Sequence, residues 1–225
     1  MSLIKETVIQ GAVIQETVIQ ETVIQGTVYG TLMNFACEHR ALASQMIEAP
    51  YKGAPVAPVL YIKTANTFSD YGANITLPSH APSVQVRASV GLIMGDAGVV
   101  DKLVLLNDLT VPHASFYRPP VKSKCIDGFL GIAQHAIAIT DLSRLDGLQI
   151  SVSINTVMVQ TIHLSQMIRS PAQLLAEVRD FIDLQAGDVL MIGSPFNAPL
   201  AKVDDHIAIS APGFASVSNR LVAQS

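Results

Sequence analysis

The chain has 225 residues, 49% of them hydrophobic, and a formal net charge of −4. This length suits one domain, or one domain with an appendage, and the acidic balance argues against nucleic acid as the main partner. No uninterrupted apolar run reaches the roughly 20 residues that would span a bilayer, and the N-terminus lacks the layout of a secretory signal. Because Cys37 and Cys125 are the only cysteines, we expect a reducing, cytoplasmic location rather than a disulfide framework.

A repeated pentad opens the sequence. Residues 6–30 read ETVIQ, GAVIQ, ETVIQ, ETVIQ and GTVYG. A five-residue period suits neither a strand nor a helix, and these few copies would barely complete one coil of a solenoid. We favour a translated repeat outside the functional domain, although Thr, Val and Ile would also allow extended β structure. The expected division is an N-terminal extension, residues 1–26, and a domain, residues 27–225.

Short strands dominate the remainder of the chain. The first is expected in GTVYGTLMNF, which starts at Gly26. Val- and Ile-rich runs bounded by Gly, Pro or Asp predict further strands at residues 58–63, 84–94, 103–108, 148–154, 188–193 and 206–211. Apolar and polar residues alternate in residues 148–154, as in a strand with one face in water.

One helix is clearly marked near residue 170. Ser170 can cap it, Pro171 suits its first position, and Gln173 would complete a capping box. The expected buried stripe contains Leu174, Leu175, Val178, Phe181 and Ile182, with Gly187 after the helix end. A second helix is expected over residues 37–47, before Pro50. Together the elements predict an α+β class with β dominant: a rolled or sandwiched sheet with few helices.

Several catalytic motifs are missing from the sequence: GxSxG, GxGxxG, the Walker loop and CxxC. The six histidines show no metal-ligand spacing. The segment SFYRPPVKSKCIDGF, residues 115–129, nevertheless concentrates Arg118, Lys122 and Lys124 in a chain that has only 14 Lys and Arg residues. In an acidic protein, such a basic segment points to a local site for a small anion.

Four segments together resemble the fumarylacetoacetate hydrolase family. They are YGTLMNFACEH (29–39), APYKGAPVAPVLYIKTANT (49–67), SFYRPPVKSKCIDGF and GDVLMIGSPFNAP (187–199). The third is the most specific, because it is similar to the family's Tyr-Arg-Pro…Lys-x-(Arg)-Asp-Gly segment. The resemblance is closest to the branch of isomerase/decarboxylases of homoprotocatechuate degradation. It implies a mixed β-roll or sandwich and an activity on 2-hydroxyhepta-2,4-diene-1,7-dioate or 5-carboxymethyl-2-oxo-hex-3-ene-1,7-dioate.

The resemblance departs from the family at the metal site. Family members bind a divalent cation such as Mg²⁺ through a Glu-x-Glu pair on a strand and a later Asp after Asn. The matching positions here are Arg87 and Ser89, and Asp108 alone retains a ligand-type side chain. Hard cations need several oxygen ligands and are repelled by a guanidinium, so we expect no cofactor. Only residues 96–102 link the two strands, so either the loop is truncated or a segment is missing.

The resemblance also implies site residues. Lys124 matches the catalytic lysine, and Tyr117 and Arg118 would line the same pocket. Glu38 and His39 are candidates for the family's acid/base dyad.

Two further positions would complete a substrate pocket. Ser194 would replace the family's carboxylate-binding threonine. Arg87 could supply the positive charge of the missing metal, which would leave a pocket that binds a dicarboxylate through cationic donors. The alternatives are that Lys122 is a surface residue and that Arg87 pairs with an acidic neighbour on an exposed face.

Two functions from different classes therefore stay open. The first is an isomerase or decarboxylase, which is expected to form a homodimer. The second is a metal-less pseudo-subunit that assembles with a metal-bearing Glu-x-Glu paralogue. No nucleic acid or membrane partner is expected in either case.

Overall fold

The computed structural model describes residues 24–113 and 120–224. Most of the expected N-terminal extension, residues 1–23, lies outside this range, as do Tyr117 and Arg118. The described chain begins with Ile24, which packs against the main core. The backbone N–H of Gly26 donates to the carbonyl of Gly187 at 3.1 Å. Within the described residues, contacts with the core are thus already present at Ile24, and the expected boundary at residue 26 stays a prediction.

One sheet contains nine strands among the described residues, in the order β2-β1-β11-β5-β6-β7-β3, with β12 beside β5 and β8 beside β6. Their bounds are β1 Val28–Leu32, β2 Val59–Lys63, β3 Phe68–Ser69, β5 Val84–Met94, β6 Val100–Thr110, β7 Leu130–Ile132, β8 Ile137–Ala138, β11 Val189–Met191 and β12 Leu200–Ala201. Strand β1 runs parallel to β11, and β3 runs parallel to β7, whereas the other pairs are antiparallel. The sheet is therefore mixed.

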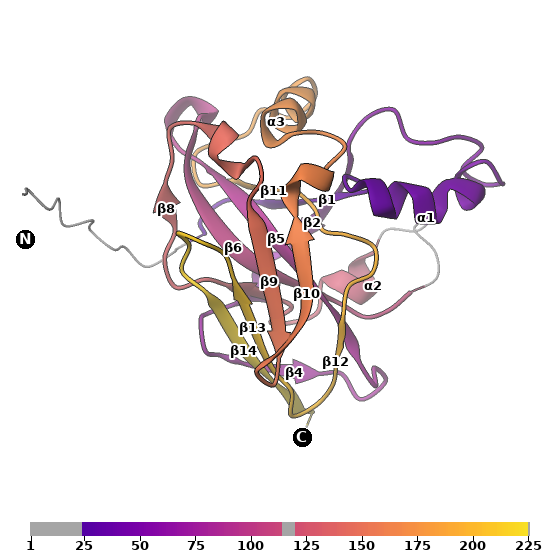
Figure 1. Cartoon of the computed structure of the whole chain (residues 1–225), viewed down its shortest axis with the longest axis vertical. Helices are drawn as coiled ribbons and strands as arrows, with labels where there is room; N and C mark the ends of the chain where they lie inside the picture. The colour runs from indigo at the N-terminus through magenta and orange to yellow at the C-terminus, as the bar shows by residue number, and fades with distance from the viewer. Residues whose placement is uncertain (1–23, 114–119, 225) are drawn as a thin grey trace, which may run out of the picture.

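A second sheet of five strands has the order β10-β9-β13-β14-β4. Its bounds are β4 Asn74–Leu77, β9 Gln149–Ile154, β10 Val157–His163, β13 His206–Ser210 and β14 Val217–Ala223. Figure 1 shows this sheet lying against the face of β5 and β6, and side chains of both sheets form one hydrophobic core. Burial of this apolar surface is the main force that holds the layers together.

The central hairpin of the larger sheet is formed by β5 and β6, each of 11 residues. Nearly every residue of β5 is buried. One face of the strand packs against the second sheet, and on the other face Arg87 contacts Glu38 of α1. Pairing extends from Gln85 opposite Thr110 to Met94 opposite Val100, with a shift of register between Ile93 and Met94. Five residues close the hairpin, and Gly95 N–H donates to the Val99 carbonyl at 2.7 Å. In this sequence the connection therefore closes as a tight turn, and whether the loop is truncated or a segment is missing stays open.

Three α-helices flank the sheets in the described ranges: α1 Ala36–Met46, α2 Val121–Lys124 and α3 Pro171–Arg179. Short 3₁₀ turns occupy Ala65–Thr67, Asp96–Gly98, Leu142–Leu145 and Leu164–Gln166. Helix α1 extends to one side of the molecule, whereas α3 covers one end of the sheets (Figure 1). The expected helix at 37–47 is confirmed within one residue at each end.

Helix α3 is shorter than the sequence predicted. Ser170 caps it as expected, since its Oγ accepts the Gln173 backbone N–H at 3.2 Å. The capping box is not closed, however: the Ser170 backbone N–H makes no hydrogen bond to the Gln173 side chain, whose Nε2 donates to Glu177 Oε1 at 2.9 Å. The helix ends at Arg179, and Phe181 is 57% exposed, so its assignment to the buried stripe was wrong. The helical spacing of apolar residues in the sequence continues to Phe181 and Ile182, but the helix itself ends at Arg179.

Several strands were missed by the sequence analysis, and β10 is the clearest case. A two-residue turn of Asn155 and Thr156 joins it to β9, with φ of 50° and 69°. Two consecutive positive φ values suit the tight hairpin turn that follows the twist of the strands. The signal is weak in the sequence because this turn usually carries Gly, and Thr rarely adopts positive φ.

The predicted class is confirmed: the protein is β-dominant, with two curled sheets and few helices. Among the described residues, no helix is long and apolar enough to cross a bilayer.

Candidate active site

Asp108 lies at the centre of a buried polar cluster. It points from β6 to the side opposite the apolar layer between the sheets, and it is 1% exposed. Its Oδ2 accepts hydrogen bonds from Lys124 Nζ at 2.7 Å and from the Tyr61 hydroxyl at 2.5 Å. Lys63 Nζ lies 3.1 Å from Oδ1, as an ion pair without the alignment of a hydrogen bond. One carboxylate therefore serves two ammonium groups.

Lys124 enters the cluster from the last residue of α2. Its Nζ donates to Thr110 Oγ1 at 2.7 Å as well as to Asp108, and it lies 4.4 Å from the centre of the Tyr61 ring. The side chain is 1% exposed. A carboxylate, a hydroxyl and the face of an aromatic ring thus hold this ammonium in one position, as a cation that is removed from water requires.

Lys63 comes from β2, two residues after Tyr61, so the two side chains share one face of the strand. Its Nζ donates to the Phe129 carbonyl at 2.9 Å and also to the carbonyl of Lys124. Lys63 therefore ties β2 to the segment that carries Lys124, in addition to its ion pair with Asp108.

A second buried ion pair joins Arg87 of β5 to Glu38 of α1, with Nη2 3.0 Å from Oε1. The other carboxylate oxygen of Glu38 accepts the Met33 backbone N–H at 2.7 Å. Arg87 lies directly across the ladder from Asp108, which places this pair beside the first group. The interpretation of Arg87 on an exposed face is wrong, because it is 4% exposed, although its partner is acidic as that interpretation proposed.

Arg87 and Ser89, the positions at which the resemblance implied a Glu-x-Glu pair, both bind the loop that contains Gly193 and Ser194. Arg87 Nη2 donates to the Ser194 carbonyl at 3.4 Å, and Ser89 Oγ donates to the Gly193 carbonyl at 2.9 Å. Gly193 has a φ of 97°, and an added Cβ would lie 3.1 Å from the Thr31 carbonyl oxygen. The loop is therefore fastened to β5 by backbone carbonyls, and Ser194 is buried at the edge of the cluster.

The burial and charges of the cluster shift three pKa values. Burial raises the pKa of Tyr61 well above its usual value, and the neighbouring Asp108 carboxylate adds to that effect. Burial alone would raise the pKa of Asp108, but Lys124 and Lys63 outweigh it and hold this pKa well below the usual range. Burial lowers the pKa of Lys124 to about 8, with help from Arg87 and Lys63 and against the attraction of Asp108.

These residues do not fit a divalent cation. Among the described residues, the oxygens of the buried Asp108 carboxylate are taken by Tyr61, Lys124 and Lys63. Glu38, the other buried carboxylate, is occupied by Arg87 and the backbone. Three cations surround two carboxylates, so the local charge repels Mg²⁺ rather than attracting it.

The structure brings five of the sequence-predicted residues to one place: Lys124, Asp108, Arg87, Glu38 and Ser194. His39 follows Glu38 on α1 but lines a separate cavity of about 380 Å³ with Arg40, Ile168 and Arg169. Tyr117 and Arg118 lie outside the described residues. The roles assigned to all of these residues stay predictions, whereas Lys122 is exposed as its surface alternative proposed.

Sequence reasoning missed Lys63, Tyr61 and Thr110. A signal existed for the first two, since a lysine and a tyrosine two residues apart in an otherwise apolar strand share one face. No local pattern indicated that this face would be buried against Asp108.

Comparison with known proteins decides the family. The fumarylacetoacetate (FAA) hydrolase C-terminal family model matches residues 27–222. The chain belongs to this family. The match covers nearly all of the described residues and includes every member of the buried cluster.

Among curated relatives, the chain is 32% identical over 209 residues to the 4-hydroxyphenylacetate degradation bifunctional isomerase/decarboxylase of Salmonella dublin, covering 87% of this chain and 48% of the relative. It is 31% identical over 207 residues to the homoprotocatechuate catabolism bifunctional isomerase/decarboxylase of Escherichia coli, covering 86% and 47%. The chain thus spans about half the length of these relatives.

Solved structures share the fold at lower identity. The 5-carboxymethyl-2-hydroxymuconate delta-isomerase of Mycobacterium smegmatis has a TM-score of 0.76 at 17% identity, covering 92% of this chain and 82% of that one. The fumarylpyruvate hydrolase of Pseudomonas aeruginosa, solved with Mn²⁺ and pyruvate, has a TM-score of 0.76 at 17% identity, covering 94% of each chain. These likenesses establish the mixed β-roll that the resemblance implied.

Proposed function

We propose that the protein is an isomerase or decarboxylase of aromatic catabolism. Its substrate would be 2-hydroxyhepta-2,4-diene-1,7-dioate, a dicarboxylate, or 5-carboxymethyl-2-oxo-hex-3-ene-1,7-dioate, a tricarboxylate, both of 4-hydroxyphenylacetate degradation. The observation that carries the proposal is the buried Lys124–Asp108 pair, in a chain 31–32% identical to isomerase/decarboxylases of that route.

The chemistry of both reactions suits this cluster. Moving a double bond takes a proton from one atom of the substrate and returns it to another carbon, through an enolate. Losing CO₂ leaves the same kind of enolate, which then takes a proton on carbon. Near neutral pH, a lysine with a pKa of about 8 can give a proton as the ammonium, and the neutral amine that results can take one back. The excess positive charge of Lys124, Lys63 and Arg87 would stabilise the enolate and the carboxylates beside it.

Metal independence is part of the proposal. Because Arg87 and Ser89 replace the Glu-x-Glu pair, cationic side chains would meet the substrate's carboxylates directly. Titration calorimetry with Mg²⁺ should give no stoichiometric heat, and a chelator should leave activity unchanged. Tight binding of Mg²⁺, or activity lost on chelation, would rule out this part.

The alternative is a catalytically weak pseudo-subunit that assembles with a metal-bearing Glu-x-Glu paralogue. Two observations favour it: the chain spans about half of its curated relatives, and its glutamate pair is replaced. Purified protein should be assayed on the hydroxydienedioate alone, with Mg²⁺, and with the paralogue. Turnover by the chain alone supports the first function, and turnover that needs the paralogue supports the second.

Assembly and location complete the proposal. We expect a homodimer or a heteromer, since fourteen large apolar side chains are exposed among the described residues and several line the outer strands. Light scattering at micromolar concentration that gives a 24.0 kDa particle would contradict this. A cytoplasmic location agrees with the two cysteines, which are free thiols.

A further inference from the structure

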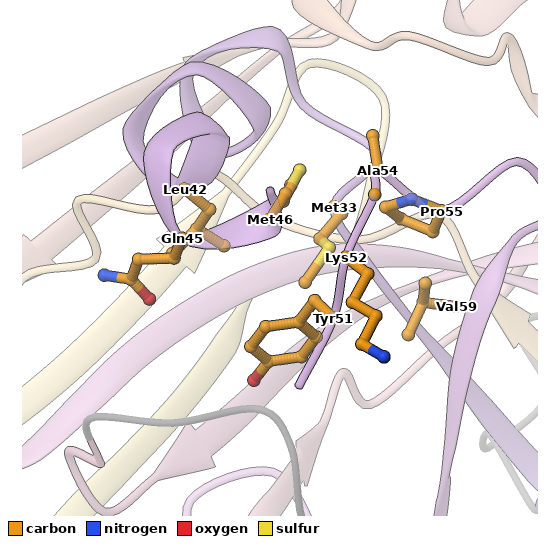
Figure 2. A pocket seen from close by; sticks show the side chains of 10 residues that line it. Met33, Leu42, Gln45, Met46, Tyr51, Lys52, Ala54, Pro55 and Val59 are labelled. Carbon is orange, nitrogen blue, oxygen red and sulfur yellow. The ribbon is translucent and has the colours of Figure 1, made fainter. Parts of the chain in front are cut away.

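An apolar cavity separate from the buried cluster lies between α1 and the chain that follows it. Its volume is about 440 Å³, and it is lined by Met33, Leu42, Gln45, Met46, Tyr51, Lys52, Gly53, Ala54, Pro55 and Val59. Figure 2 shows Met33 and Met46 near its centre, with Leu42 and Gln45 on the helical side and Ala54, Pro55 and Val59 across from them. Nothing in the proposed reaction uses this space.

The walls suit a compact apolar body. Leu42 and Met46 are buried on the inner face of α1, and they form a small hydrophobic cluster with Met33 and with Val59 of β2. This cluster is distinct from the main core between the sheets. Methionine side chains adapt their shape and contact aromatic rings favourably. A hollow lined in this way accepts aryl or alkyl groups, as most small-molecule sites do.

The mouth of the cavity carries one positive charge. Lys52 is exposed, and within the described ranges no ion pair joins it to an acidic side chain. In Figure 2 its ammonium extends past Met33 toward Val59. An anion bound here would contact a cation that makes no ion pair with any described residue, next to apolar side chains.

The backbone reinforces this assignment. Lys52 and Met33 both have positive φ, of 62° and 59°, although neither is Gly or Asn. Such conformations cost energy and tend to persist at functional sites. Two of the six positive-φ residues other than glycine in the described chain therefore line one cavity.

We propose that this cavity binds a monocarboxylate with a compact apolar body, with the apolar part between Met33, Met46 and Val59 and the carboxylate on Lys52. The site is linked to the candidate active site, because the Met33 backbone N–H donates to Glu38 at 2.7 Å and Tyr61 packs in the same small cluster. A ligand that contacts Met33 therefore touches the residue that orients the Glu38–Arg87 pair.

The test uses 3-phenylpropionate as the probe and protein labelled with ¹³C at its methionine methyl groups. The Met33 and Met46 signals are assigned with Met33→Leu and Met46→Leu variants. We expect both signals to shift in a saturable manner with 3-phenylpropionate, and neither to shift with succinate, which lacks the apolar body, or with 3-phenylpropionamide, which lacks the charge.

Two charge variants give a matched comparison. Lys52→Gln should weaken binding by roughly tenfold, as the loss of a hydrogen bond to a charged group does. Arg40→Gln removes an equally exposed cation that lines only the neighbouring cavity, and should leave the affinity unchanged. Both positions are exposed, so neither change threatens the fold.

Three results would overturn the proposal. The first is that 3-phenylpropionamide binds as tightly as 3-phenylpropionate. The second is that Lys52→Gln and Arg40→Gln weaken binding equally, and the third is that only the methyl signals of methionines outside the cavity shift. The measurement reads binding alone, so it stands or fails independently of whether the chain turns over a dicarboxylate.

Discussion

At the scale of single residues, the feature that matters most is the sharing of Asp108. Two lysines and a tyrosine converge on one carboxylate, so neither ammonium has a full counterion. A buried lysine that shares its carboxylate with another lysine has a lowered pKa, because its charge is neither hydrated nor fully neutralised. A residue that transfers protons near neutral pH needs such a pKa. Lys63 thus acts on Lys124 through Asp108, as a positioning residue.

The first prediction concerns the pKa of Lys124. Replacing Lys63 with Met removes a neighbouring positive charge and leaves Lys124 as the one ammonium group paired with Asp108 among the described residues. The pKa of Lys124 should therefore rise from about 8 toward its model-compound value of 10.5. The ¹³Cε signal of Lys124, followed against pH by NMR, measures this directly. Lys122→Met, which removes an exposed lysine two residues away, is the control and should leave the titration in place.

The same shift has a consequence for stability. The folded protein binds fewer protons at Lys124 than the unfolded chain does between about pH 8 and 10.5. The contribution of Lys124 to the free energy of unfolding should therefore rise with pH through this window. Urea unfolding at pH 8.0 and 9.5 tests the sign, with Lys124→Met as the comparison. A larger gain with pH in the variant than in the parent would contradict the assignment.

The second prediction concerns the Glu38–Arg87 pair. Arg87→Met should reduce the free energy of unfolding by about 3–5 kcal/mol, because it leaves a buried carboxylate without its cation. Adding Glu38→Gln should recover part of that loss. Chemical denaturation of the single and double variants gives the coupling energy. Additive losses would show that the two side chains do not interact energetically.

At the scale of elements, β1 and β2 place Tyr61 by means of a glycine. Gly30 of β1 is the cross-strand partner of Tyr61, and a Cβ on Gly30 would overlap the tyrosine ring. The ring lies flat over this position, which directs its hydroxyl to Asp108. Gly30 is thus needed for close approach rather than for an unusual backbone angle.

The third prediction follows from that contact. Gly30→Ala should displace the Tyr61 ring and lower kcat, while the fold is retained and the melting temperature falls by a few degrees. Steady-state kinetics and a thermal melt provide both readouts. If the effect acts through Tyr61, Gly30→Ala should add little to the kinetic loss of Tyr61→Phe. Independent, multiplying losses would show that Gly30 acts elsewhere.

Secondary-structure elements could be predicted from the sequence better than the tertiary contacts between them. The apolar runs at 84–94 and 188–193 gave β5 and β11 nearly in full, because buried strands need continuous apolar residues. It missed β10 because Asn-Thr is a rare hairpin turn. Lys63 was missed because burial of a lysine depends on the partner that another strand supplies, Asp108 of β6. Contacts between distant strands carry no local signal.

At the scale of the whole molecule, Ile24, the first described residue, already packs against the core, and the family match begins at residue 27. The fourth prediction is that deleting residues 1–23 leaves the melting temperature unchanged within about 1 °C, whereas deleting residues 1–27 lowers it. The longer deletion removes Ile24 and the hydrogen bond from Thr27 N–H to Asp188, 2.7 Å long. Calorimetry of the two truncated proteins checks this. If deletion of residues 1–23 abolished the cooperative melt, the repeats would be part of the core.

The tight turn between β5 and β6 has a consequence for folding kinetics. Arg87, Asp108 and Thr110 belong to one hairpin of adjacent chain, whereas Tyr61, Lys63 and Lys124 must arrive from elsewhere. Hairpins close in microseconds, while distant strand pairs wait for long loops to close. We expect the hairpin to be structured in the folding transition state, so Leu92→Ala and Leu103→Ala should slow folding, with φ-values above about 0.5. Lys63→Met, in contrast, should leave the folding rate nearly unchanged and speed unfolding.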